Sequence, residues 1–151
     1  MTLRSLLFTP WSNPIGDTLL RLFVRIALAG PFYVSGRIKV VEGSWFTISD
    51  STYSLFESEY AGVPLPSQFA AHAATAAEHV LPLLLLIGLG TRFAALGLLV
   101  MTLTIQIFVY PDAWWSVHMG WAALALTVLL IGPGRLSLDA LLFGKDRLGP
   151  Q

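Results

Sequence analysis

Glu78 and His79 lie next to each other inside a long apolar stretch of this sequence, and His118 lies inside another. A charged side chain in the hydrocarbon of a membrane costs at least about 2.5–3.5 kcal/mol on insertion scales, so ionisable residues at such positions commonly have a function. A buried carboxylate can handle protons or bind a ligand, and imidazoles can bind metals. For Glu78, the alternative is a structural ion pair that fixes the register of the helices.

Three histidines are the candidate metal ligands. His72 and His79 are seven positions apart and share one face of a helix. Together with His118 they would form a site for copper, zinc or a haem iron. Alternatively, each histidine satisfies a neighbouring carbonyl or lines a wet cavity. The second interpretation is favoured because the sequence contains neither an HxxxH nor an ExxH arrangement.

The composition is that of an integral membrane protein. The chain has 151 residues, of which 55% are hydrophobic and 12% are charged, whereas soluble domains average about 25% charged residues. A bilayer core about 30 Å thick requires roughly 20 mostly apolar residues per helix. The segments that meet this requirement are, approximately, 17–39, 67–89, 93–110 and 114–131. Because most connections are short, we expect an all-α fold, an up-down bundle of four transmembrane helices that forms one domain over residues 1–151.

The connection 41–66 is longer than the others. It contains Tyr53, Phe56 and Tyr60 at helical spacing among acidic residues, which predicts an amphipathic helix or a re-entrant segment on the membrane face. The net charge is zero and no basic stripe is present, so nucleic acid is not an expected partner. The expected partners are the lipid bilayer and either a protein partner or further copies of the chain.

Lysine and arginine residues indicate the orientation. With both termini in the cytoplasm, the inner side of a bacterial-type cytoplasmic membrane would carry most of these residues, which is the usual bias. These inner residues are Arg4, Arg21, Arg92, Arg135, Lys145 and Arg147. Arg21 and Arg25 are expected to extend toward the inner headgroups.

A helical rise of about 1.5 Å per residue places several polar side chains at similar heights in the outer half of the membrane. The resulting polar cluster consists of Tyr33, Arg37, Lys39, Glu78, His79, Gln106 and His118. On the same measure Arg25 is roughly 12 Å from Glu78 along the membrane normal. We therefore expect Glu78 to pair with Arg37 or Lys39.

The sequence resembles the DoxX-like small membrane proteins from about Leu22 to Leu142. The segments that carry the resemblance are RIALAG at 25–30, YVSGRIK at 33–39, and Ala77-Glu78 followed by GLGTR at 88–92. The run from Gln106 to Trp114, with His118 after it, is similar to a subgroup encoded beside copper-linked peptide-modification genes. The resemblance implies a four-helix membrane protein in which Arg25, Lys39, Glu78 and Arg92 are the family-motif residues. Some relatives are subunits of thiosulfate–quinone oxidoreductases or partners of redox-stress enzymes.

Three functions follow as hypotheses. The first is an accessory subunit of a membrane redox or copper-handling system, which binds a quinone, a metal or a partner protein in a polar cavity in the outer half of the bilayer. Tyr33 and Gln106 would then hydrogen-bond a quinone carbonyl. The second is a non-catalytic anchor or assembly factor for a partner protein. The third is a small transporter. The cofactor stays open between quinone and copper, and no catalytic residue is assigned.

Overall fold

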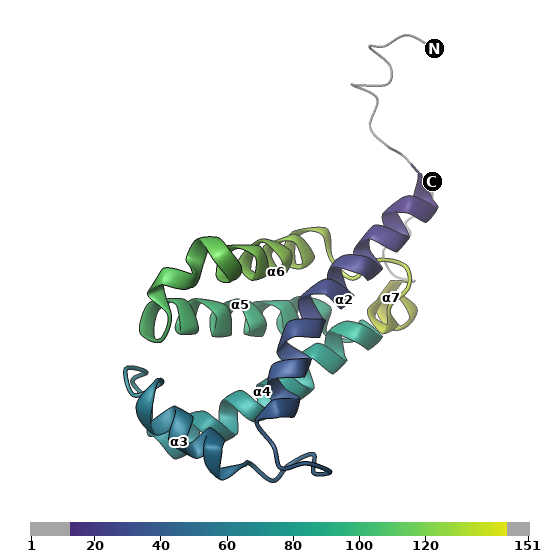
Figure 1. Cartoon of the computed structure of the whole chain (residues 1–151). Coiled ribbons are helices and arrows are strands. Elements are labelled where there is room, and N and C mark those ends of the chain that lie inside the picture. The colour runs from purple at the N-terminus through teal and green to yellow at the C-terminus, as the bar shows by residue number, and fades with distance from the viewer. Residues whose placement is uncertain (1–12, 145–151) are drawn as a thin grey trace.

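The computed structural model describes residues 13–144, and within this range the protein is built from helices (Figure 1). The α-helices are α2 (Pro14–Ile38), α3 (Asp50–Ser58), α4 (Ser67–Ile87), α5 (Thr91–Phe108), α6 (Met119–Ile131) and α7 (Leu138–Phe143). A 3₁₀ turn, η1 (Pro111–Ala113), and a π-helical turn, η2 (Trp114–His118), lie between α5 and α6. The predicted all-helical fold is confirmed.

Four helical segments of the described chain are long and apolar enough to cross a membrane, as the sequence predicted. They are Pro14–Ile38, Ser67–Ile87, Thr91–Phe108 and Pro111–Ile131, the last of which combines η1, η2 and α6. Local chemistry determines where they begin and end. Asn13 caps α2 by accepting hydrogen bonds from the backbone N–H groups of Ile15 and Gly16. Gly88 ends α4 in the left-handed conformation, with φ of +71°.

The spanning helices pack around one apolar core. Figure 1 shows α5 and α6 side by side and antiparallel, with α2 crossing α4. The fully buried core side chains come from all four spans and include Leu28, Phe32, Leu85, Leu98 and Val128. Large apolar side chains cover the outside of the bundle as well: Phe93 is 83% exposed and Leu130 is 78% exposed. An apolar exterior of this kind fits lipid rather than water.

The long connection contains the expected amphipathic helix. In α3, Phe56 is buried against Ala70 and Ala71 of α4, while Glu57 on the same helix is exposed. Before α3, an isolated β-bridge joins Val40 and Ile48. The short helix α7 was not predicted. It lies beside the end of α4 (Figure 1) and is joined to it by a hydrogen bond from the Asp139 N–H to the Gly88 carbonyl.

Candidate functional site

Glu78 of α4 forms a buried ion pair with Lys39, which follows α2. The Lys39 Nζ lies 2.8 Å from Oε2 of Glu78 and 3.1 Å from Oε1. Ser35 completes the network, because its hydroxyl donates to Oε1 of Glu78 at 3.2 Å and accepts from Lys39 Nζ at 2.8 Å. Lys39 is 5% exposed and Glu78 is 3% exposed. Of the two predicted partners of Glu78, the structure therefore selects Lys39.

Gly36 lets α2 and α4 approach closely enough for this pair to form. A Cβ atom at Gly36 would lie 3.0 Å from His79 Nδ1 and 3.1 Å from the backbone carbon of Glu78. These separations are tighter than ordinary van der Waals contact, so a larger residue would push the two helices apart. Glycine at this crossing keeps Ser35, Lys39 and Glu78 within hydrogen-bonding distance.

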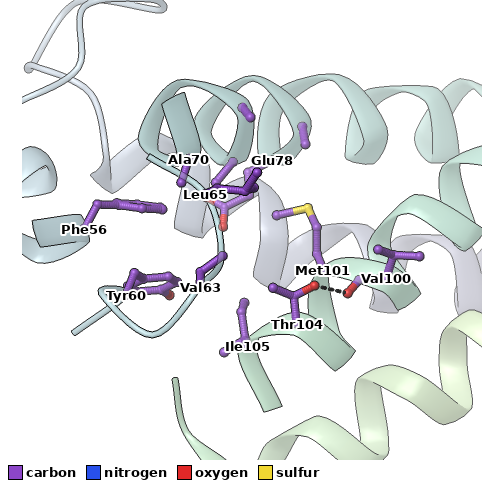
Figure 2. A pocket seen from close by; sticks show the side chains of 13 residues that line it. Phe56, Tyr60, Val63, Leu65, Ala70, Glu78, Val100, Met101, Thr104 and Ile105 are labelled. Carbon is purple, nitrogen blue, oxygen red and sulfur yellow. Dashed lines mark hydrogen bonds between the residues drawn. The ribbon is translucent and has the colours of Figure 1, made fainter. Parts of the chain in front are cut away.

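Glu78 also lines a cavity of about 250 Å³, which we call the alanine pocket (Figure 2). Alanines of α4 create the space, and α5 and the segment after α3 close its other sides. The lining residues are Phe56, Tyr60, Val63, Leu65, Ala70, Ala73, Ala74, Ala77, Glu78, Val100, Met101, Thr104 and Ile105. Ala73 and Val100 are exposed on the outside of the bundle. The alanine pocket therefore opens between α4 and α5 toward the side that faces lipid.

The sequence predicted a polar cavity, and the alanine pocket differs from that prediction because it is mostly apolar. Of Tyr33, Glu78, His79 and Gln106, which the sequence suggested as ligand-binding groups, only Glu78 lines it. The reason is that most of the polar side chains bond to one another or to the backbone. Small alanine side chains, which recur along one face of α4, form the cavity instead.

Segment 59–66 covers one side of the alanine pocket. The Tyr60 ring stacks on Phe56 with the ring centroids 4.4 Å apart. Burial raises the pKa of Tyr60 to about 12, so its hydroxyl stays protonated at neutral pH. Tyr110, after α5, donates a hydrogen bond to Glu59. A Cβ atom at Gly62 would lie 2.9 Å from the Phe108 carbonyl oxygen, so the segment is held close against the end of α5.

His79 is buried beside Glu78 and has one unpaired nitrogen. Its Nδ1 lies 2.7 Å from the Thr75 carbonyl oxygen, and because that oxygen can only accept, Nδ1 carries the proton. The Nε2 atom has no hydrogen-bond partner among residues 13–144. The rings of Tyr33 and Trp45 lie 6.3 Å and 6.2 Å from the imidazole, centroid to centroid.

Gln106 and His118 form a separate polar pair between α5 and η2. Nδ1 of His118 lies 2.7 Å from Oε1 of Gln106, and the amide of Gln106 donates to the Pro111 carbonyl at 2.5 Å. His118 packs against Trp121, which in turn packs against Phe32, with ring centroids 5.5 Å and 5.1 Å apart. The predicted polar cluster thus consists of two groups, one around Glu78 and one around His118.

The structure does not bring His72, His79 and His118 together. Nε2 of His72 lies 3.2 Å from the Tyr53 hydroxyl and Nδ1 lies 2.7 Å from the Gln68 carbonyl oxygen. The part of the chain that the structure describes contains no group of three or more His, Cys, Asp or Glu side chains that could hold a metal ion.

Arg37 does not reach Glu78. Its guanidinium carbon lies 4.5 Å above the Trp45 ring, and Nη1 donates to the Ser44 carbonyl at 2.9 Å. This cation–π contact attaches the start of the long connection to the end of α2.

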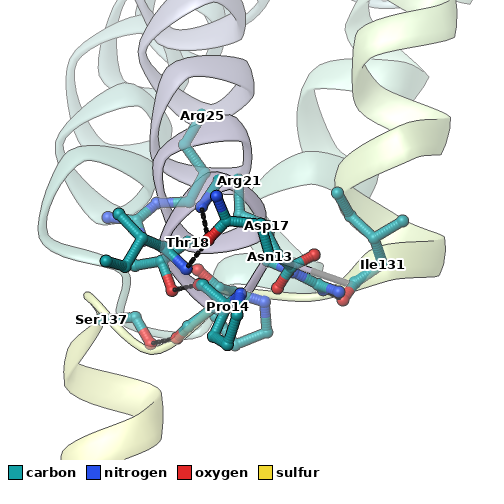
Figure 3. A network of polar contacts seen from close by, with 12 residues as sticks. Asn13, Pro14, Asp17, Thr18, Arg21, Arg25, Ile131 and Ser137 are labelled. Atoms are coloured by element: carbon teal, nitrogen blue, oxygen red, sulfur yellow. Dashed lines mark hydrogen bonds and ion pairs between the residues drawn. The ribbon is translucent and has the colours of Figure 1, made fainter. Parts of the chain in front are cut away.

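The expectation that Arg25 extends to the inner headgroups is wrong. Arg25 is 1% exposed and donates hydrogen bonds to the carbonyls of Leu85, Leu86, Pro133 and Leu136 at 2.7, 2.8, 2.9 and 2.6 Å. The last carbonyls of a helix lack the usual partners one turn further on. At the end of α4, the Gly88 N–H reaches the Leu85 carbonyl at 3.2 Å, and the guanidinium supplies donors to both Leu85 and Leu86. Arg21, one turn earlier, pairs with Asp17 at 2.8 Å and also donates to the Ile131 carbonyl (Figure 3).

Asp139 of α7 caps the start of α5. Its carboxylate accepts the backbone N–H groups of Gly90 and Thr91 at 2.8 Å and 2.9 Å. Burial alone would raise the pKa of Asp139, but these hydrogen bonds and the charge of Arg25 outweigh it, and the pKa lies below its usual range. Arg92, the next residue along α5, is exposed at this same end of the bundle.

The positions and types of these residues agree with one known family. The model of the DoxX family matches residues 20–111, from α2 to the start of η1. The chain belongs to the DoxX family. An uncharacterized protein of Haemophilus influenzae is 31% identical to this DoxX protein over 136 residues, which are 85% of this chain and 86% of that protein. No solved structure matches the chain.

The four residues that the resemblance implied as family-motif residues all lie within the matched region of this DoxX protein. Lys39 and Glu78 form the buried pair, Arg25 binds the end of α4, and Arg92 is exposed at the start of α5. The resemblance to the DoxX family is confirmed. Membership of the copper-linked subgroup stays a prediction.

Proposed function

We propose that this DoxX protein is an accessory membrane subunit of a redox system and that it binds the ring of a lipid-soluble quinone in the alanine pocket. The observation that carries the proposal is an apolar cavity that opens toward lipid and contains one carboxylate, Glu78. Binding sites for small molecules are commonly apolar hollows with a few polar groups that orient the ligand. A lipid-soluble ring with polar substituents fits such a lining.

The size of the alanine pocket supports a ligand that is held only in part. Its volume of about 250 Å³ lies just below the roughly 300–1,000 Å³ of typical ligand pockets. A quinone ring would enter between α4 and α5, and its hydrocarbon tail would stay among the lipid chains. A partner protein would supply or accept the electrons, so the role is that of a subunit.

A substitution in the pocket, matched by one outside it, tests the proposal. Ala73 and Ala76 are both exposed alanines of α4, but only Ala73 lines the alanine pocket. We expect Ala73→Phe to fill the cavity and to lower the affinity for a short-chain ubiquinone by about tenfold or more, because the ring loses its buried apolar contacts. Ala76→Phe should bind like the wild type. The measurement is titration calorimetry on protein in lipid nanodiscs.

Equal affinities for the wild type and a folded Ala73→Phe variant would place the ligand elsewhere. If the wild type binds no quinone and instead co-purifies with a soluble protein, the anchor or assembly function replaces this proposal.

We also propose that both termini lie in the cytoplasm and that the alanine pocket lies in the outer half of the membrane. Exposed Arg92 and Arg135 lie at the end of the bundle where α2 begins and α7 packs, while exposed Glu42, Asp50 and Glu57 lie in the connection at the opposite end. Basic residues favour the cytoplasmic side of a membrane.

A further inference from the structure

We infer that the hydroxyl group of Tyr60 donates a hydrogen bond to a carbonyl oxygen of the ring that binds in the alanine pocket. Tyr60 is then the residue that selects a quinone ring over a hydrocarbon ring of similar shape. This inference rests on the proposed function and specifies which group of the pocket recognises the ligand. It concerns binding alone and includes no electron transfer.

Three polar side chains line the pocket, those of Tyr60, Glu78 and Thr104. Glu78 has no free position for a ligand, because Oε1 already accepts two hydrogen bonds and Oε2, which pairs with Lys39, is enclosed by protein. The Thr104 hydroxyl donates to the Val100 carbonyl of its own helix at 2.9 Å, so its proton is already in use (Figure 2). The donor that remains in the lining is the hydroxyl of Tyr60.

The Tyr60 hydroxyl is available to a ligand. Within residues 13–144 it makes no hydrogen bond, and it is not among the enclosed polar atoms of this range, whereas Oε2 of Glu78 is. Burial raises the pKa of Tyr60 to about 12, and the charges of Tyr110 and Glu78 raise it further, so the hydroxyl keeps its proton at neutral pH. An influence of Glu78 requires the hydroxyl to lie near the carboxylate that lines the same pocket.

The Tyr60 ring is held in position before a ligand enters. It stacks on Phe56 and meets Tyr110 edge to face, with ring centroids 4.4 Å and 6.3 Å apart. Figure 2 shows the rings of Phe56 and Tyr60 pointing from the side of α3 toward Val63 and the pocket. A donor that is already in place loses little conformational freedom on binding, so more of the energy of its hydrogen bond contributes to affinity.

A quinone carbonyl is a suitable partner for this donor. Among lipid chains the carbonyl oxygen has no donor, so a hydrogen bond from Tyr60 would be gained when the ring enters the pocket. A hydrocarbon ring would gain the same apolar contacts without this bond. We therefore expect one carbonyl to point toward segment 59–66 while the ring lies against the alanines of α4.

A pair of ligands tests the inference on the whole protein in lipid nanodiscs. Duroquinone, a tetramethylbenzoquinone, and durene, the corresponding tetramethylbenzene, are flat rings of similar size, but only the quinone carries carbonyls. We expect Tyr60→Phe to weaken the binding of duroquinone by about tenfold. The affinity for durene should not change, because the phenylalanine ring can still stack on Phe56. The measurement is the distribution of each ligand between nanodiscs with and without the protein, which corrects for partitioning into lipid.

Tyr53→Phe is the matched control. It removes a tyrosine hydroxyl that contacts His72 and does not line the pocket. This variant should bind both ligands like the wild type.

Infrared spectroscopy of bound duroquinone gives a second readout, which a change in packing alone would not produce. A hydrogen bond weakens the C=O bond, so the carbonyl stretch should lie at lower wavenumber in the wild type than in Tyr60→Phe. The same carbonyl stretch in both proteins would contradict the inference.

The outcomes separate this inference from the proposed function. Equal affinities of the wild type and Tyr60→Phe for duroquinone, or an equal loss of affinity for duroquinone and durene, would overturn the role of the hydroxyl but leave the quinone site in place. If wild-type nanodiscs take up no more duroquinone than empty ones, the proposed function fails and this inference fails with it.

Discussion

At the scale of single residues, Arg25 shows how one buried cation joins three parts of the chain. Its guanidinium lies on α2 and binds two carbonyls at the end of α4 and two in the connection between α6 and α7. Gly88 allows this approach, because a Cβ atom there would lie 3.1 Å from the guanidinium carbon and 2.4 Å from the Ser137 Cβ. The buried guanidinium of Arg25 thus caps the C-terminal end of α4 inside the protein.

Replacement of Arg25 should destabilise the bundle strongly. Arg25→Met would remove the guanidinium donors from four buried or partly buried carbonyls, of which only that of Leu85 also accepts the Gly88 N–H in the described chain, and a buried group left without a partner costs about 1–3 kcal/mol. We expect a loss of several kcal/mol, measured as a large fall in the thermal unfolding midpoint or as failure to accumulate in the membrane. Arg135→Met, at an exposed position of the same end, is the control and should change stability little. Similar midpoints for the two variants would contradict a central role for Arg25.

The sequence predicts contacts between single residues correctly where their positions along the membrane normal decide the contact. The rise of a helix placed Glu78 near Arg37 and Lys39 and far from Arg25, and the ion pair forms with the second of these two candidates, Lys39. The same reasoning failed for Arg25 because it considered only side chains as partners. The carbonyls at the end of α4 are equally good acceptors, and the early stop of that helix at Gly88 was the signal that pointed to them.

At the scale of elements, apolar length and end signals predicted the four spans to within a few residues, because a membrane helix must satisfy its own backbone. In the structure Asn13 caps the start of α2, and Gly88 and Gly90, both in the left-handed conformation, stand at the end of α4 and the start of α5. The alanine pocket was not predictable in this way. The pocket depends on how α3, α4 and α5 pack against one another. Alanines at helical spacing in a sequence are equally consistent with closely packed helices and with a cavity between them.

Segment 59–66 runs from α3 to the end of α5 and covers one side of the alanine pocket. Its hydrogen bond to Tyr110 can be tested by substitution. Tyr110→Phe removes the hydrogen bond to Glu59. Hydrogen bonds to charged groups contribute about 1.5–3 kcal/mol, so local opening should become on the order of tenfold more frequent. Hydrogen exchange of the Val63 amide, which bonds to the Tyr60 carbonyl at 3.0 Å, would report this change.

Tyr53→Phe is the matched control, because it removes a tyrosine hydroxyl from its contact with His72 near the start of α3. It should leave the exchange of the Val63 amide unchanged. Equal acceleration in both variants would mean that α3 and the segment open together, with no separate attachment at Tyr110.

At the scale of the whole molecule, the two ends of the bundle differ in chemistry. The end that contains the start of α2, the start of α5 and α7 uses arginines to bind carbonyls and presents Arg92 and Arg135 on its surface. The other end carries the acidic connection, the cation–π contact of Arg37 with Trp45, and the buried pair of Lys39 and Glu78. The orientation of the bundle therefore decides from which leaflet a ligand reaches Glu78.

Thiol labelling can establish this orientation because the native chain has no cysteine. Glu57→Cys places a single thiol on exposed α3, and Leu136→Cys places one at an exposed position beside α7. If the basic end faces the cytoplasm, a membrane-impermeant maleimide should label Glu57→Cys in intact spheroplasts and Leu136→Cys only after the membrane is permeabilised. Detergent-solubilised protein, in which both thiols should react, is the control. The reverse pattern would place Glu78 and the alanine pocket in the inner half of the membrane, and a quinone would then have to enter from the cytoplasmic leaflet.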